Sequence, residues 1–361
     1  MNDNVLNFPS PGRVLEHRSL DPQLPPPSFP LSYLHRHGDE ASHPTLESLL
    51  RIIGTHIEVP RRVCAAAYEN EERSIIAALE AAHFSAARVN PTRVPDEVLI
   101  PASAHESIPR LVEDMGLRPV LVRVDPFTDL ASPRAMAQAL SRRSLLILAS
   151  APTPSDGIVD PVSELAALAA GHGVWLHVDA TAGGFLLPYE ARLVPELAEF
   201  RFWTPGVSSV AVNISSAPAL HGGPVAMFAR RAEIGELGLA PSELGESEAR
   251  DLLASLRSLG DAGHLELVMR GVEARARLLD YVENHPDLAL HPRGGLREVQ
   301  FSHLRADSRI LADALHGRGW WLRTRPCPRT GIRRICVPIN PASAEHIRRL
   351  IADIEALLPR R

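Results

Sequence analysis

The fold is decided by Trp175-Leu176-His177-Val178-Asp179-Ala180-Thr181-Ala182-Gly183-Gly184-Phe185, an apolar run that ends in a carboxylate and a pair of glycines. Short apolar runs of this kind, separated by helical segments, are typical of a parallel sheet covered on both faces. Ligands of such sheets bind beyond the carboxyl ends of the strands. The stretch therefore predicts an α/β fold with a binding site around Asp179.

Strands and helices alternate on both sides of this stretch. Ser132 followed by Pro133 is typical of a helix start, and Gly171 with Gly173 of a helix end. The alternation predicts a large α/β domain over residues 45–235. We expect strands at Val98–Ile100, Val120–Val124, Leu145–Leu148, Val174–Val178, Ser209–Val212 and Val225–Phe228, and helices from about Thr45 and over Glu71–Ala82, Glu106–Met115, Pro133–Leu140 and Val162–Ala170.

The pattern changes toward both ends of the chain. A long helical stretch, Glu246–Val282, leads to two short β segments and a last amphipathic helix, Ala344–Leu358. We expect the β segments at Glu298–His303 and Ile332–Pro338, and residues 236–361 as a smaller C-terminal α+β domain. Residues 1–44 are rich in proline and lack a helical period, so they predict an extended arm.

Composition excludes several classes of function. The net charge is -5, which argues against nucleic acid as an obligate partner. The chain has 3 cysteines, too few and too scattered for a disulfide framework. No signal peptide and no long apolar run is visible, so we expect a cytoplasmic protein with no membrane segment. The histidines between His35 and His43 fit no standard metal-site spacing, and we expect no metal.

The chain contains no lysine, because all 38 residues in the Lys+Arg count are arginine. A GC-rich gene explains much of this depletion, but not the loss at one chosen position. An imine needs a primary amine, which Ser, Arg and His do not offer. Apart from the N-terminal α-amine, no group in the chain can hold an aldehyde covalently.

A second loop strengthens the picture around Asp179. It reads Ser150-Ala151-Pro152-Thr153-Pro154-Ser155-Asp156-Gly157-Ile158-Val159-Asp160-Pro161, and Pro101-Ala102-Ser103-Ala104-His105 adds a third element. Together, in this order, they resemble the pyridoxal-phosphate fold-type-I group that holds the amino-acid decarboxylases and, closest, sphingosine-phosphate lyase. The resemblance implies an aspartate-aminotransferase-like large domain with a mostly parallel seven-stranded sheet, a smaller C-terminal domain, and a dimer.

The resemblance also assigns roles to individual residues. Asp179 matches the aspartate that pairs with the cofactor's ring nitrogen and keeps it protonated; the alternative is a strand-end cap or an ion pair with an arginine. His105 matches the histidine that stacks on the ring, or else it is a polar residue that precedes a helix. Ala151 and Thr153 lie in the loop that would contact the cofactor. His177 is also a candidate contact, although we expect it on the opposite side of the strand and structural.

The chain departs from the family where the chemistry occurs. The family's Ser-x-Asp-x-His-Lys reads here with Asn213 for Asp, Ser215 for His and Ser216 for Lys. A second family lysine is replaced by His221. The best match to the glycine-bearing phosphate turn is His43-Pro44-Thr45-Leu46-Glu47-Ser48, which has no glycine and in which Thr45 would be the contact.

Three functions follow from these departures. The chain is a degenerate subunit, a pseudoenzyme in a homodimer or in a heterodimer with a lysine-bearing, pyridoxal-phosphate-dependent paralogue. Alternatively, it is an enzyme acting on an amine-bearing carbon without lysine, with His221 or His105 as base. That enzyme would use non-covalent pyridoxal or pyridoxamine phosphate, or no cofactor. The third possibility is a non-catalytic protein that binds the cofactor or a small amine or amino-acid ligand.

Overall fold

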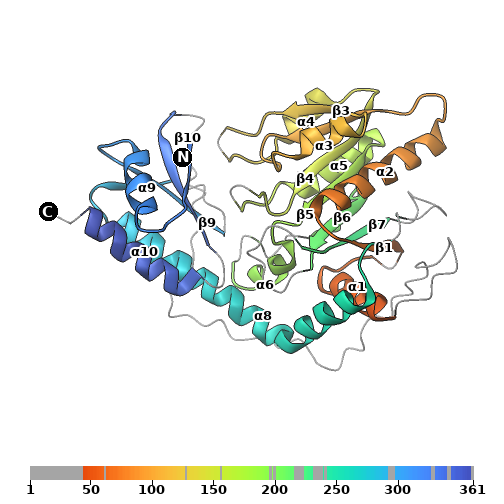
Figure 1. Ribbon diagram of the computed structural model, residues 1–361. Coiled ribbons are helices and arrows are strands. Elements are labelled where there is room, and N and C mark those ends of the chain that lie inside the picture. The colour runs from red at the N-terminus through yellow and green to blue at the C-terminus, as the bar shows by residue number, and fades with distance from the viewer. Residues whose placement is uncertain are drawn as a thin grey trace.

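The computed structural model describes residues 44–60, 62–126, 128–154, 157–194, 197, 201–214, 223–230, 239, 242–291, 297–326, 330–339 and 343–358. They form two units, each built on a sheet of its own (Figure 1). The expected α/β fold with a second, smaller unit is confirmed. The expected proline-rich arm lies outside the described residues except for Pro44, which begins the first helix.

The larger sheet has the strand order β1-β7-β6-β5-β4-β2-β3 in the described part of the chain. Strands β2 to β6 run parallel, and β7 is antiparallel to both of its neighbours. The sheet is therefore mostly parallel, as expected. Its strands are β1 (Val63–Tyr68), β2 (Glu97–Pro101), β3 (Arg118–Val122), β4 (Ser144–Ser150), β5 (Trp175–Ala180), β6 (Ser209–Asn213) and β7 (Val225–Arg230).

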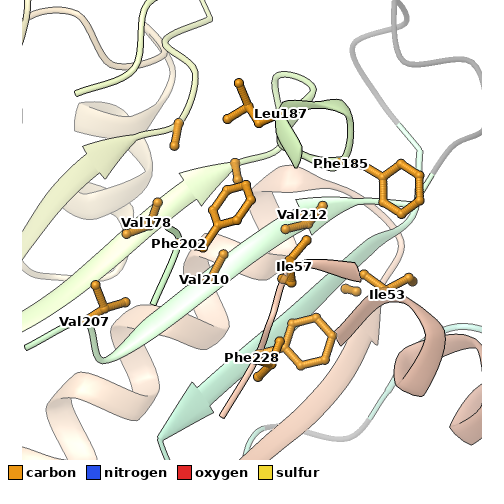
Figure 2. Packing of buried hydrophobic residues seen from close by; sticks show 14 of the residues in the cluster. Ile53, Ile57, Val178, Phe185, Leu187, Phe202, Val207, Val210, Val212 and Phe228 are labelled. Carbon is orange, nitrogen blue, oxygen red and sulfur yellow. The ribbon is translucent and has the colours of Figure 1, made fainter. Parts of the chain in front are cut away.

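Helices cover both faces of this sheet, and the alternation of side chains along each strand decides which core they join. In β5, Val178 enters one core, together with α1, α4, α5 and α6, whereas Trp175 enters the other, with α2 and α3. Figure 2 shows Val178, Val210 and Phe228 in the first core, with Ile53 of α1 beside Phe228. The helices are α1 (Pro44–His56), α2 (Glu71–Val89), α3 (Ile108–Asp114), α4 (Pro133–Ala139), α5 (Val162–His172) and α6 (Leu187–Glu190), with a short 3-10 turn at Gly184–Leu186.

The smaller unit is a four-stranded antiparallel sheet of order β10-β11-β9-β8, backed by helices. The long helix α8 (Glu246–Glu283) runs along both units (Figure 1). Leu253 and Val268 of α8 pack in the core of the large sheet, whereas Ala274 and Leu278 pack in that of the small one. The two cores therefore meet within α8 rather than at the expected boundary of residue 235. The remaining elements are β8 (Leu288–His291), β9 (Glu298–His303), α9 (Ser308–His316), β10 (Arg323–Pro326), β11 (Arg333–Pro338) and α10 (Ser343–Leu357).

Five of the described helices and strands were not expected from the sequence: β1, α6, β8, α9 and β10. Strand β1 reads Val-Cys-Ala-Ala-Ala-Tyr, and alanine is depleted in strands because it packs little surface. The strand forms because β7 pairs with it along its whole length and because all six residues are buried. Because β1 was not predicted, the start of α2, which follows β1 directly, was not placed at the edge of the sheet.

Gly206, in the turn before β6, has a backbone φ of +103°, and a Cβ there would overlap the carbonyl oxygen of Ala166 in α5. We expect Gly206→Ala to lower the free energy of unfolding by about 3 kcal/mol, through a strained φ and a forced backbone shift. Gly116→Ala, at φ +74° with open space around it, isolates the φ cost of about 1 kcal/mol. Urea denaturation compares the two variants. Equal losses would show that the contact with Ala166 contributes nothing.

Candidate active site

The carboxyl ends of β4, β5 and β6 bring three polar side chains together. Ser150 pairs in register with Asp179, and Asp179 pairs with Ala211, two residues before Asn213. Residues in register on neighbouring strands, and residues two apart on one strand, point to the same face. Ser150, Asp179 and Asn213 are 0%, 1% and 8% exposed. They form a buried polar edge on the face that α2 and α3 cover.

Asp179 has one oxygen that is bound and one that is open to a ligand. Its Oδ1 accepts hydrogen bonds from the Thr181 N–H at 3.0 Å and from the Thr181 hydroxyl at 2.6 Å. Its Oδ2 is buried and has no hydrogen-bond partner among the described residues. Burial raises the pKa of Asp179, and the bonds from Thr181 and the charge of His105 oppose that rise. A buried acceptor without a donor suits an N–H group from a bound molecule.

Glu71, in the first turn of α2, faces the same place. Burial is the largest cause that raises its pKa to about 8; the charge of Asp179 adds to the rise, and a hydrogen bond with Thr181 opposes it. The Thr181 hydroxyl has one proton, which it donates to Asp179. With a pKa of about 8, Glu71 holds a proton at neutral pH. Glu71, Thr181 and Asp179 thus lie together at this edge of the sheet.

His105 lies close to Asp179. Its ring is half-buried, and Nδ1 lies 2.8 Å from the Ser107 hydroxyl. Its charge lowers the pKa of Asp179, which places the imidazole within electrostatic reach of that carboxylate.

The loop after β4 is fixed by Asp160, which is completely buried. Its two oxygens accept from the backbone N–H groups of Ala131 and Ser150, each at 2.8 Å. Burial raises the pKa of Asp160 to about 6, although both backbone bonds favour the ionised form. Thr153 closes the same loop, because its N–H donates to Ile158 O and its hydroxyl accepts from the Ile158 N–H. The Ala151 N–H donates to the Asp179 carbonyl at 2.8 Å, so this loop is attached directly to β5.

The expectation that His177 points away from Asp179 is wrong. Residues two apart on a strand share a face, and the contacts agree. His177 Nδ1 lies 2.8 Å from the Ser209 hydroxyl, which also accepts from the Trp175 indole N–H at 2.8 Å, while Val178 packs in the opposite core. Burial lowers the pKa of His177 to about 3, so the ring is neutral. It precedes Asp179 by two residues in β5, and its contact with Ser209 joins β5 to β6.

Other candidates from the sequence are not brought to this group. Ser215, Ser216 and His221 lie outside the described residues. Thr45 lies in the first turn of α1, donates to Glu246 at 2.8 Å, and belongs to the helix that packs on the opposite face of the sheet. The helix start beside Asp179 is that of α2, where the Asn70 side chain accepts from the Arg73 N–H at 3.0 Å. Asn70 followed by two glutamates is a recognisable helix start, and once β1 is placed it identifies this position.

The described residues show neither a metal-binding cluster nor a membrane-spanning helix. Within the described ranges, no cluster of three or more His, Cys, Asp or Glu side chains is arranged to hold a metal ion. Of the helices that the structure describes, none combines the length and apolar character needed to cross a membrane.

The chain is similar to proteins of known activity. The model of the DegT/DnrJ/EryC1/StrS aminotransferase family matches residues 74–201. Sphingosine-1-phosphate lyase of Arabidopsis thaliana is 27% identical over 72% of this chain and 51% of its own length. A probable L-tyrosine/L-aspartate decarboxylase of Methanothermobacter thermautotrophicus is 28% identical over 72% of this chain and 74% of its own. The chain thus spans about half the length of the Arabidopsis lyase.

Solved structures share the fold. Sphingosine-1-phosphate lyase of Burkholderia pseudomallei superposes with a TM-score of 0.72 and 23% identity, covering 87% of this chain and 75% of that one. Oryza sativa TDC with PLP and tryptamine gives a TM-score of 0.73 at 16% identity, again over 87% of this chain and 74% of the other.

Proposed function

We propose that this chain, which is similar to pyridoxal-phosphate-dependent decarboxylases and lyases, is a degenerate homologue that acts as a subunit beside a lysine-bearing partner. One observation carries the proposal: the sequence contains no lysine at all. The chemistry of this family is supplied by a cofactor aldehyde that a primary amine holds. No side chain of this protein offers one.

The residues present fit only one end of the cofactor. The unpartnered Oδ2 of Asp179 suits a protonated ring nitrogen. The phosphate end does not fit, because the first turn of α2 carries Glu71 and Glu72. The Arg73 N–H in that turn is already bound by the Asn70 side chain. A phosphate would meet carboxyl groups where it needs hydrogen-bond donors.

The retained scaffold supports a role in an assembly. The seven-stranded sheet, the buried edge around Asp179 and the C-terminal unit are all present without the amine they would serve. We infer that the partner is a second copy or, preferably, a paralogue with the lysine, and that the assembly is cytoplasmic. The alternative of a lysine-independent enzyme needs a base at the site, and His105 is the described imidazole that lies within electrostatic reach of Asp179.

Native purification tests the proposal. The protein, isolated from its own cells without a denaturing step, is expected to bring along a lysine-bearing homologue, identified by native mass spectrometry. Borohydride should fix cofactor on the partner and leave the mass of this chain unchanged. Decarboxylase or lyase turnover is expected in the complex and not in this chain alone. Turnover by the purified chain alone would overturn the proposal.

Ser216→Lys alone should not restore activity. The new amine would have no neighbouring Asp or His, since Asn213 and Ser215 stand at those positions, and Glu71 still opposes phosphate. Loss of a positioned acid or base typically costs about 10²–10⁴ in rate. The variant is incubated with pyridoxal phosphate, and its absorbance and its decarboxylase and lyase turnover are measured. Measurable turnover in this single variant would contradict the prediction.

A further inference from the structure

The start of α2 carries the opposite charge to the one an anion site needs. A helix N-terminus presents backbone N–H groups and a positive dipole end, and so favours anions. Here the helix supplies its own carboxyl groups, Glu71 and Glu72, in that turn. Arg73 does not offset them, because its guanidinium binds Glu243, with Nε at 2.6 Å from the carboxylate.

We propose that the site between Glu71, Thr181 and Asp179 binds a small cationic amine that has no phosphate group. The inference rests on the proposed function, since it requires that no covalently held cofactor occupies the site. It goes further by naming the ligand class: a primary ammonium, whose N–H groups face the two carboxyl groups.

Two buried acceptors point to such a donor. Asp179 Oδ2 and Ser150 Oγ have no hydrogen-bond partner among the described residues, and both side chains are nine-tenths buried or more. They lie in register on adjacent strands, on the same face. An ammonium group offers several N–H donors and satisfies buried acceptors at short range. A phosphate oxygen offers no donor to either.

The charges around the site favour the same ligand. Among the described residues, the side chains that shift the pKa of Glu71 are Asp179, Thr181 and Glu72, and those that shift the pKa of Asp179 are Thr181 and His105. No arginine of the described part of the chain is among them. His177, on the same face of β5, is neutral because burial lowers its pKa. When Glu71 and Asp179 are both ionised, the site has more negative than positive charge. A bound ammonium removes that excess.

Proton release provides a signature. Because Glu71 has a pKa of about 8, it holds a proton at pH 7 in the ligand-free protein. A cation beside it favours the ionised form, so binding at pH 7 displaces this proton and binding at pH 9 does not. The folded, ligand-free pKa lies above the pKa of the complex, and affinity therefore rises with pH. A primary ammonium stays charged to about pH 9. Between pH 7 and pH 9 the affinity should rise about tenfold.

Calorimetry with 2-phenylethylamine tests the pH dependence on the full chain. The wild type should bind about tenfold more tightly at pH 9 than at pH 7 and release a proton at pH 7, seen as a dependence of the heat on the buffer. Glu71→Gln should lose both effects. Glu72→Gln, the adjacent and exposed glutamate of the same turn, is the matched control and should keep them.

A matched ligand pair tests the rejection of phosphate. Pyridoxamine and pyridoxamine 5′-phosphate share ring and amine, and at pH 8 the first should bind at least tenfold more tightly. Glu71→Gln should narrow that ratio, and Glu72→Gln should leave it closer to the wild type. Equal or tighter binding of the phosphate, no binding of either amine, or an unchanged pH dependence in Glu71→Gln would overturn the inference. None of these outcomes bears on the lysine-bearing partner, which native mass spectrometry tests separately.

Discussion

Arg297→Ala is expected to lower the free energy of unfolding by about 3–5 kcal/mol, because it leaves a buried carboxylate without its partner. Arg297 directly precedes β9 in the smaller unit and reaches across to the larger one. Its guanidinium lies 2.9 Å from Glu190 and donates to the Gly183 carbonyl at 2.7 Å. The side chains of Arg297 and Glu190 are 15% and 8% exposed. Burial raises the pKa of Glu190, and Arg297 opposes that rise.

Guanidinium chloride denaturation at pH 7 measures the loss. Arg192→Ala breaks an ion pair with Asp261 whose side chains are 35% and 60% exposed, and should cost less than about 1 kcal/mol. Without Arg297 the pKa of Glu190 rises further, so the variant should lose stability as pH rises and recover part of it as pH falls. Combining Arg297→Met with Glu190→Gln should restore much of the stability at pH 7. A loss that the double variant does not reduce would show that the carboxylate is not its cause.

Asp160→Ala should cost about 4 kcal/mol, since two buried backbone N–H groups lose their acceptor at about 1–3 kcal/mol each. The groups belong to Ala131 and Ser150, and the second of these holds the β4 end beside Asp179. Denaturant unfolding at pH 7 gives the size of the loss. The matched control, Asp114→Ala, removes an exposed carboxylate that pairs with Arg110 four residues away at 2.9 Å.

The effect of Asp160→Asn separates the two bonds. The amide keeps one acceptor oxygen and turns an NH₂ donor toward the other backbone N–H. Its loss should therefore fall between those of the alanine variant and the control. If Asp160→Ala and Asp114→Ala lose the same stability, the two backbone N–H groups must find other partners, and the loop after β4 does not depend on Asp160.

Local signals in the sequence were sufficient for most of the architecture. Ser132 caps α4 by accepting from the Ala135 N–H, and Gly173 ends α5 in the left-handed region, both as expected. The strand at Glu298–His303 has the expected bounds. These features depend on neighbours along the chain or on strong apolar patterns, and a single sequence displays both.

The site was harder to predict, because it depends on which helix start meets which strand end. Asp179 and His105 were found through the resemblance, whereas Glu71 and Thr181 were missed. An alanine-rich strand has little apolar surface, so β1 was not predicted. Without β1, the predicted phosphate-binding turn was the segment around Thr45 and not the start of α2. The prediction for His177 was wrong for another reason. His177 and Asp179 are two residues apart, and residues two apart on a strand point to the same face, so the sequence alone contained the correct answer.

Gly260 sets a bend in α8. It interrupts α8 with φ 57° and ψ -173°, a backbone conformation that is essentially restricted to glycine. From there to Glu283 the helix extends about 34 Å, at 1.5 Å per residue. Because Leu265 and Val268, which follow Gly260, pack in the core of the large sheet, α8 is held against that sheet on both sides of the bend. The two torsion angles of Gly260 therefore set the direction in which α8 leads from the large sheet to the C-terminal unit.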